Sequence, residues 1–249
     1  MTFEYNSKLM NSLITWLIKL RQRKVIEMIN APSIANCDFL KMGKQIDELI
    51  AGNVTFLHID LMDGNYVPNL FLPTSIVKAI KTKYPNVIAD VHLMVNNPDN
   101  YIDLLKKYGA DYVSFHIDST SFVIRLLINI RNKGMKAGVA INPSQRIDII
   151  EPFIHYLDYV VLMTVEPGFA SQKFMEGSLE RLDELNKLRE KTNTNFLISI
   201  DGGIDYPNSI ESLKRGAEIL VTGIYTVFNQ PDGLTNACIR FEKEMSGIK

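Results

Sequence analysis

The stretch 56–64 carries two residues of metal-binding type on one side of a predicted strand. Apolar residues alternate there with His58 and Asp60 until Gly64 ends the run. Because alternate residues of a β-strand point to the same side, His58, Asp60 and Met62 share one face. Imidazole and carboxylate groups are common ligands of zinc and related divalent metals. This segment therefore predicts one part of a metal site.

Similar residues recur at two further predicted strands. His92 and Met94 share a face in the segment 90–94, which stands at the end of an apolar run, and Asp201 follows the apolar run 196–200. One histidine in a strand, or one aspartate before glycine, is more often a hydrogen-bonded core or turn residue. Their joint occurrence at strand ends favours a metal site with a polarisable methionine lining.

Eight apolar segments predict the strands that position these residues. We expect strands at 28–33, 56–61, 87–93, 112–116, 137–141, 159–163, 196–200 and 219–222. Amphipathic helical stretches are expected at 38–51, 73–83, 98–107, 120–133, 147–154, 178–191, 207–215 and 234–245. Alternating strands and helices of this number predict an α/β fold, the TIM (β/α)8 barrel, whose catalytic residues lie at the C-terminal ends of the strands.

The domain organisation follows from the absence of a linker in the sequence. No Pro- or Ser-rich stretch divides the chain after residue 28, so we expect a single barrel domain over 28–249. An open, doubly wound sheet would require a glycine-rich turn after the first strand. Residues 31–35 read Ala-Pro-Ser-Ile-Ala, which is not such a turn.

Residues 1–27 form an additional N-terminal segment with apolar residues at helical spacing. These residues are Leu9, Leu13, Trp16, Leu17 and Leu20. The basic run 21–24 follows them, whereas a signal peptide carries its charge before the apolar stretch. We expect an amphipathic extension that packs on the barrel or on another subunit. A helix on a membrane surface and a true start at Met28 are the alternatives.

Composition excludes several classes of function. The net charge is −1, and no basic run is interleaved with aromatic residues, which argues against a nucleic-acid partner. Cys37 and Cys238 stand far apart, so neither a disulfide framework nor a zinc ribbon is expected, and a reducing cytoplasm fits. No apolar run approaches the roughly twenty residues of a transmembrane helix. Small acidic metabolites remain as ligands.

Five motifs occur in an order that resembles one enzyme family. They are APSI at 31–34, HIDLMDGNYVPN at 58–69, DVHLM at 90–94, MTVEPGF at 163–169 and DGG at 201–203. Together they resemble ribulose-phosphate 3-epimerases and the related D-allulose-6-phosphate 3-epimerases. The resemblance extends from about residue 28 to residue 230.

The resemblance implies a metal-dependent isomerase. His58, Asp60, His92 and Asp201 would bind one divalent metal ion, Zn²⁺ or Fe²⁺, with Mn²⁺ or Co²⁺ as alternatives. Asp60 and Asp201 would also be the catalytic acid and base. The remaining substrate contacts would come from Ser33, from Met62, Met94 and Met163 around the enediolate, and from Gly168, Phe169, Ala170, Ser171, Gln172, Gly202, Gly203, Gly223 and Ile224 near the phosphate.

The implied reaction interconverts D-ribulose 5-phosphate and D-xylulose 5-phosphate, a step of the pentose phosphate pathway. Inversion at C3 requires removal of a proton beside a carbonyl and its return on the opposite face. Two carboxylates perform this two-base transfer through a cis-enediolate, which the metal stabilises as a Lewis acid. The resemblance implies a small phosphorylated ketose as substrate, and we also expect a homo-oligomer.

Some residues depart from the pattern of the family. Ala170 and Ser171 stand where these epimerases have two glycines, and Ile224 replaces a serine that helps to hold the phosphate. Ala170, 154–155 and 228–229 resemble the allulose-phosphate branch, whereas 201–203 resembles the ribulose-phosphate branch. D-allulose-6-phosphate 3-epimerase is therefore the alternative function. An inactive sugar-phosphate-binding barrel is a further one.

Three other polar residues have less specific expectations. Asp90 shares a face with His92 one layer deeper, so we expect it to orient a ligand imidazole. His116 ends a strand and is expected to make a structural hydrogen bond. His155 precedes a strand and is expected to be exposed.

Overall fold

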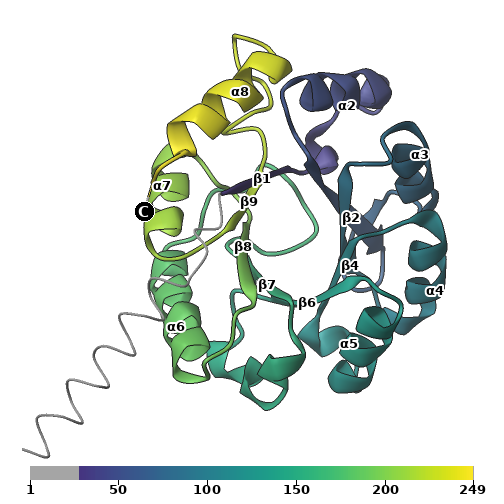
Figure 1. Ribbon diagram of the computed structural model, residues 1–249, viewed down its shortest axis with the longest axis vertical. Helices are drawn as coiled ribbons and strands as arrows, with labels where there is room; N and C mark the ends of the chain where they lie inside the picture. Colours follow the sequence, from purple (N-terminus) through teal and green to yellow (C-terminus); the bar gives the residue numbers. More distant parts are fainter. Residues whose placement is uncertain (1–27, 249) are drawn as a thin grey trace, which may run out of the picture.

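The computed structural model describes residues 28–248, which form a curled sheet with helices on its outer side (Figure 1). The sheet has nine strands in the order β1-β9-β8-β7-β6-β5-β4-β2-β3. All neighbouring strands are parallel except β2 and β3. A parallel bridge between Ser33 and His58 links the end of β1 to β2 and closes the ring. The fold is a TIM barrel, as expected.

Apart from β3, the observed strands agree with the expected ones to within two residues at each end. They are β1 Ile29–Pro32, β2 Phe56–Asp63, β3 Leu70–Phe71, β4 Ile88–Met94, β5 Tyr112–His116, β6 Lys136–Ile141, β7 Tyr159–Met163, β8 Leu197–Asp201 and β9 Ile219–Thr222. The helices are α2 Met42–Ala51, α3 Ser75–Lys83, α4 Asp99–Tyr108, α5 Val123–Asn132, α6 Ser178–Lys191, α7 Tyr206–Lys214 and α8 Leu234–Met245. Short 3₁₀ helices are η1 Ile34–Asn36, η2 Ile117–Ser119 and η3 Ile147–Tyr156.

Two elements differ from the expectation. The segment Ile147–Tyr156 is a 3₁₀ helix with Pro152 inside it, and proline cannot donate the backbone hydrogen bond of an α-helix. Strand β3 was not expected. Its two residues pair antiparallel with Met62 and Asp63, so β2 continues beyond the expected end at residue 61.

Strand β2 is buried on both sides, and this determines where its polar residues lie. Leu57, Ile59 and Leu61 belong to the main hydrophobic cluster between the strands and the surrounding helices. The alternate residues His58 and Asp60 therefore face the interior of the barrel. The same alternation places the polar residues of β4 and β8 in that interior.

Two further expectations concern the N-terminal segment and membrane-spanning helices. Residues 1–27, for which an amphipathic extension is predicted, lie outside the described residues, so that prediction stays open. Within residues 28–248, every helix is too short or too polar to cross a membrane.

Candidate metal and phosphate site

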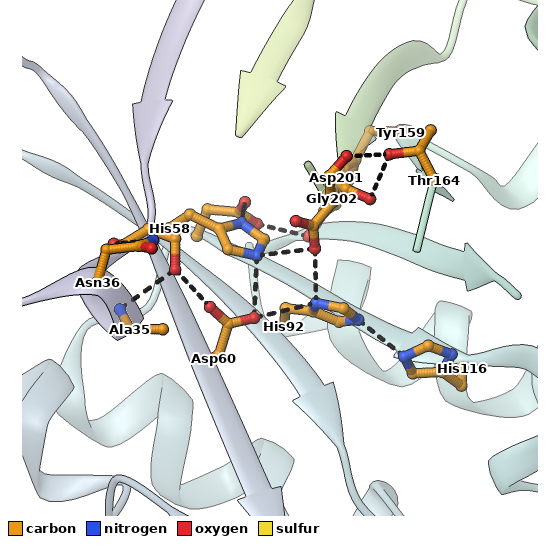
Figure 2. Close-up of polar contacts among 12 residues, drawn as sticks. Ala35, Asn36, His58, Asp60, His92, His116, Tyr159, Thr164, Asp201 and Gly202 are labelled. Atoms are coloured by element: carbon orange, nitrogen blue, oxygen red, sulfur yellow. Dashed lines mark hydrogen bonds and ion pairs between the residues drawn. The ribbon is translucent and has the colours of Figure 1, made fainter. Parts of the chain in front are cut away.

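Four side chains from three strands converge in the barrel (Figure 2). His58 and Asp60 come from β2, His92 from β4 and Asp201 from the end of β8. In the parallel register of β2 and β4, Asp60 lies opposite His92, so the two side chains are at the same height. One ligand atom from each of the four residues lies within 4.8 Å of the others. The sequence-predicted ligand set is thus brought together.

The spacing of these atoms fits a bound metal ion. Nε2 of His58 is 3.3 Å from Oδ1 of Asp60 and 3.5 Å from Oδ2 of Asp201. Nδ1 of His92 is 3.3 Å from each of the same two oxygens. Tetrahedral ligands at about 2.0 to 2.2 Å from zinc are about 3.3 to 3.6 Å apart. Both nitrogens are buried without a hydrogen-bond partner, as expected of ligand atoms.

The four groups also perturb one another's protonation. Burial works to lower the pKa of His58, but the charge of Asp60 and the close carboxylates of Asp201, Asp60 and Asp90 raise it well above its usual value. The pKa of His92 is raised in the same way, by Asp201 and Asp60. Burial works to raise the pKa of both carboxyl groups, but the two imidazoles lower it. Two carboxylates and two nitrogens therefore form a donor set suited to a divalent cation.

His58 is held from behind by a buried carboxylate. Its Nδ1 is 2.8 Å from Oδ2 of Asp90, and Oδ1 of Asp90 accepts a hydrogen bond of 2.8 Å from the Tyr159 hydroxyl. Asp90 thus orients the imidazole of His58, a member of the candidate metal group. Sequence reasoning missed Tyr159. Its signal is Gly138, because a Cβ there would lie 2.4 Å from the tyrosine ring.

His92 has an imidazole behind it instead. Its Nε2 is 2.9 Å from Nε2 of His116, and the two rings are stacked with centroids 4.9 Å apart. Burial and the neighbouring positive charge of His92 lower the pKa of His116 well below its usual value. The expected hydrogen bond of His116 is therefore made to a member of the metal group. His155 is exposed, as expected.

Ser33 fixes the second oxygen of Asp60. Its hydroxyl donates a hydrogen bond of 2.6 Å to Oδ2 of Asp60 and accepts one from the amide of Ala35 at the start of η1. Because Oδ2 is occupied by Ser33, Oδ1 of Asp60 is the atom directed at the two imidazoles. The serine thus orients the carboxylate.

A cavity lies above the metal group. Its lining includes Asp60 and Asp201, whereas His58 and His92 lie beneath it with no exposed surface. The lining also includes every residue that the sequence resemblance assigns to substrate contacts: Ser33, Met62, Met94, Met163, Gly168, Phe169, Ala170, Ser171, Gln172, Gly202, Gly203, Gly223 and Ile224. Met62 and Met94 pack against each other beside Val67. Their role in substrate binding stays a prediction.

Backbone amides gather at the end of the cavity formed by the β8 and β9 loops. Gly203 has a φ of 62°, and a Cβ there would lie 2.3 Å from the backbone nitrogen of Phe174, so no larger residue fits. Within residues 28–248, the amides of Gly203 and Ile224 donate to no protein acceptor. The Gly223 amide, expected to hold phosphate, donates to Oγ1 of Thr226 at 3.0 Å. Free amides of this kind form anion-binding sites.

The β7 loop closes one side of the cavity. The side-chain amide of Gln172 donates to the carbonyls of Glu166 and Phe169, and the Tyr225 hydroxyl donates to the carbonyl of Ser171 at 2.9 Å. Tyr225 therefore ties the β9 loop to the β7 loop. Sequence reasoning missed this tyrosine, because a hydroxyl two residues after Gly223 has no pattern that would reveal its partner.

Solved structures resemble this fold at low sequence identity. A 3-hexulose-6-phosphate synthase from Salmonella typhimurium matches with a TM-score of 0.65 and 17% identity, covering 88% of this chain and 100% of that chain. KGPDC from Streptococcus mutans matches with a TM-score of 0.62 and 13% identity, covering 89% and 99%. These likenesses concern the fold. Fold and site together are those of a TIM-barrel enzyme with a group suited to a divalent metal.

Sequence comparison identifies the family. Residues 29–228 match the model of the ribulose-phosphate 3 epimerase family. A ribulose-phosphate 3-epimerase of Aquifex aeolicus is 42% identical over 193 residues, covering 78% of this chain and 86% of the relative. One of Bacillus subtilis is 38% identical over 203 residues, covering 81% and 93%. The chain belongs to the ribulose-phosphate 3-epimerase family and is an isomerase acting on carbohydrates.

Proposed function

We propose that the protein interconverts D-ribulose 5-phosphate and D-xylulose 5-phosphate. The observation that carries the proposal is the placement of two carboxylates. Asp60 and Asp201 approach the pair of imidazoles from opposite sides (Figure 2), and each has one oxygen 3.3 Å from Nδ1 of His92. A ketose positioned between them presents one face of C3 to each carboxylate. This arrangement suits inversion by proton removal on one face and proton return on the other.

The chain's own residues perform the proton transfers. One carboxylate removes the C3 proton, and the other, in its protonated form, donates a proton to the opposite face. The hydrogen bond from Ser33 keeps Asp60 in one orientation during this exchange. The sulfur atoms of Met62 and Met94 surround the reacting carbons without offering competing protons. A divalent cation held by His58, Asp60, His92 and Asp201 would stabilise, as a Lewis acid, the negative charge that develops on the substrate oxygens.

The other end of the substrate would be held by the free amides of the phosphate region. Gly203 and Ile224 both line the cavity, in the loops that follow β8 and β9. A phosphate anchored there fixes the distance between the phosphorylated carbon and C3. Anchoring therefore orients C3 between the two carboxylates.

An epimerisation assay with the metal-loaded protein tests the proposal. We expect conversion of ribulose 5-phosphate to xylulose 5-phosphate with a kcat/KM well above that for allulose 6-phosphate. One observation favours the six-carbon substrate as second candidate, because Ile224 removes a hydroxyl from the phosphate region. Faster turnover of allulose 6-phosphate would establish that candidate. Turnover of neither sugar would favour a sugar-phosphate-binding barrel.

We infer that the metal is Zn²⁺ or Fe²⁺, with Mn²⁺ or Co²⁺ as alternatives. Two imidazole nitrogens and two carboxylate oxygens suit borderline first-row ions better than Ca²⁺ or Mg²⁺, which prefer oxygen ligands. Metal analysis of protein purified without added metal identifies the ion.

We also place the protein in a reducing cytoplasm, because Cys37 and Cys238 are both free thiols.

We propose further that the protein is a homo-oligomer. Phe39, Leu40 and Leu70 are 65, 95 and 77% exposed, and the ring of Phe39 packs on Phe71 of the β2–β3 hairpin. Such an apolar group on a surface is typical of a subunit contact. Light scattering after size exclusion tests this, and replacement of Leu40 by Asp should shift the protein to the monomer.

A further inference from the structure

A hydrogen bond joins the imidazole rings of His92 and His116. Their Nε2 atoms are 2.9 Å apart, so one imidazole donates and the other accepts. A metal ligand must be unprotonated, and the nitrogen of His92 that faces the metal group is Nδ1. A neutral His92 that leaves Nδ1 free carries its hydrogen on Nε2. His92 is therefore the donor and His116 the acceptor.

The position of the hydrogen on the His116 ring follows from this direction. A neutral His116 that accepts at Nε2 carries its hydrogen on Nδ1 and needs an acceptor there. The nearby side chain of Asn142 works to raise the pKa of His116, as a hydrogen-bond acceptor would. Nδ1 of His116 and Oδ1 of Asn142 are both buried, and within residues 28–248 neither atom has a hydrogen-bond partner. Oδ1 of Asn142 is thus the acceptor available to Nδ1 of His116.

The orientation of Asn142 is fixed in turn by Tyr66. The Asn142 amide nitrogen donates a hydrogen bond of 2.8 Å to the Tyr66 hydroxyl, which leaves the amide oxygen for His116. The hydroxyl then donates to Oδ1 of Asp118 at 2.8 Å. The ring of Tyr66 also packs on the ring of His116, with centroids 4.7 Å apart. Asp118 is exposed and ends the series.

The three hydrogen bonds and the contact between His116 and Asn142 are consistent with one direction, from the metal group to the surface. An exposed carboxylate can only accept, so Tyr66 donates to it, Asn142 donates to Tyr66, and each earlier group is constrained in the same sense. The reverse direction would put a hydrogen on Nδ1 of His92 and block that ligand. The series therefore selects the metal-binding tautomer of His92.

We propose that His116, Asn142 and Tyr66 are positioning residues, which keep the hydrogen of neutral His92 on Nε2 and its Nδ1 atom aimed at the metal. This inference rests on the proposed metal-dependent function. The imidazole of His58 is oriented by a hydrogen bond to a carboxylate, whereas the imidazole of His92 is oriented by a hydrogen bond to His116 and the neutral groups that follow it. Loss of such a partner typically lowers metal affinity by about 10- to 100-fold.

The test measures Zn²⁺ affinity of the metal-free full chain by competition with a chelator. Tyr66→Phe keeps the ring but removes the hydroxyl, and we expect about a threefold to tenfold loss of affinity. His116→Phe removes the acceptor, and we expect a loss of about 10- to 100-fold. His155→Phe and Tyr156→Phe are the matched controls, because both residues are exposed and away from the site, and their affinities should equal that of wild type.

A rescue experiment separates positioning from packing. His116→Gly leaves a space the size of an imidazole, and added imidazole should restore most of the lost Zn²⁺ affinity. A packing role predicts that toluene or another apolar ring of similar size restores it equally well. Thermal unfolding of each metal-free variant reports whether the fold is intact, and Tyr66→Phe provides the answer if the glycine variant is unfolded.

The outcomes distinguish this inference from the proposed function. Wild-type affinity for Zn²⁺ in folded Tyr66→Phe and His116→Phe would overturn the positioning role and leave the epimerase proposal intact. Failure of wild type to bind Zn²⁺, Fe²⁺, Mn²⁺ or Co²⁺ would overturn both. Loss of affinity in the two variants, with both controls unchanged and rescue specific to imidazole, is the expected result.

Discussion

Nδ1 of His58 lies 2.8 Å from Oδ2 of Asp90, and neither side chain has exposed surface. Because Nδ1 of His58 donates its hydrogen to the buried carboxylate of Asp90, Nε2 is the ring nitrogen directed at Asp60 and Asp201. The tyrosine behind Asp90 completes this support. One corner of the metal group is therefore set by residues that do not reach the cavity.

Removal of the Tyr159 hydroxyl should destabilise the barrel. Tyr159→Phe leaves Oδ1 of Asp90 buried without its donor, and a hydrogen bond to a charged group contributes about 1.5 to 3 kcal/mol. We expect a loss of that size in the free energy of unfolding by urea. Tyr112→Phe is the control, because its ring packs on that of Tyr159 and no acceptor for its hydroxyl is found within residues 28–248. Equal stability of the two variants would contradict the role of Tyr159.

Each catalytic carboxylate should be needed for epimerisation but not for folding. Asp60→Asn and Asp201→Asn each remove the proton carrier for one face of C3, and we expect a fall in kcat of at least about 1,000-fold with an unchanged circular dichroism spectrum. If the metal still binds, the remaining carboxylate should exchange the C3 proton of one epimer with deuterium from solvent. Full turnover by either variant would exclude the two-base mechanism.

Metal affinity should fall as the pH falls. The carboxylates raise the pKa of His58 and His92 above the usual 6.5, so at pH 6.5 both imidazoles of the metal-free protein carry protons that a metal must displace. Calorimetry of Zn²⁺ binding in two buffers of different ionisation enthalpy measures this release. Zinc binding without proton release at pH 6.5 would contradict the account.

The same shifts determine the stability of the metal-free protein. A raised histidine pKa stabilises the fold below the unfolded value of about 6.5, and this contribution is lost as the pH rises through the raised pKa. The lowered pKa of Asp60 stabilises the fold above about 3.8, and this contribution is lost as the pH falls further. We expect greatest stability of the metal-free form between these limits, measured as the unfolding midpoint in urea.

Ile224 should distinguish the five-carbon from the six-carbon substrate. A serine hydroxyl at this position would add a charge-assisted hydrogen bond to phosphate, of about 1.5 to 3 kcal/mol less what the Ile224 amide already provides. In a ribulose-phosphate epimerase, Ile224→Ser should raise kcat/KM for ribulose 5-phosphate by about threefold to tenfold, mainly through KM. An enzyme adapted to allulose 6-phosphate, whose phosphate lies one carbon further from the metal, should show no gain.

The candidate metal group could be predicted from the sequence because each of its four residues stands on a strand. Alternation along β2 assigns His58 and Asp60 to the barrel interior, and parallel strands bring their carboxyl ends together. Strand β3 could not be predicted, since two residues after a turn carry no periodic signal. The helical pattern at 147–154 gave no indication of 3₁₀ geometry except Pro152.

The supports behind the ligands could not be predicted for a different reason. Tyr66 and Asn142 are 76 residues apart, and Tyr159 and Asp90 are 69 residues apart. Alternation shows that such side chains face the interior, but the stagger of the closed barrel decides which of them meet. The hydrogen-bond partners of His116 therefore required the structure.

Solvent exchange at C3 is the most direct test of the central claim. Metal-loaded wild type is incubated with D-ribulose 5-phosphate in D₂O, and proton NMR follows C3 and the formation of D-xylulose 5-phosphate. Proton transfer by Asp60 and Asp201 predicts deuterium at C3 of the epimer, with both processes lost when a chelator removes the metal. Epimerisation without any deuterium at C3, or no reaction at all, would contradict the account.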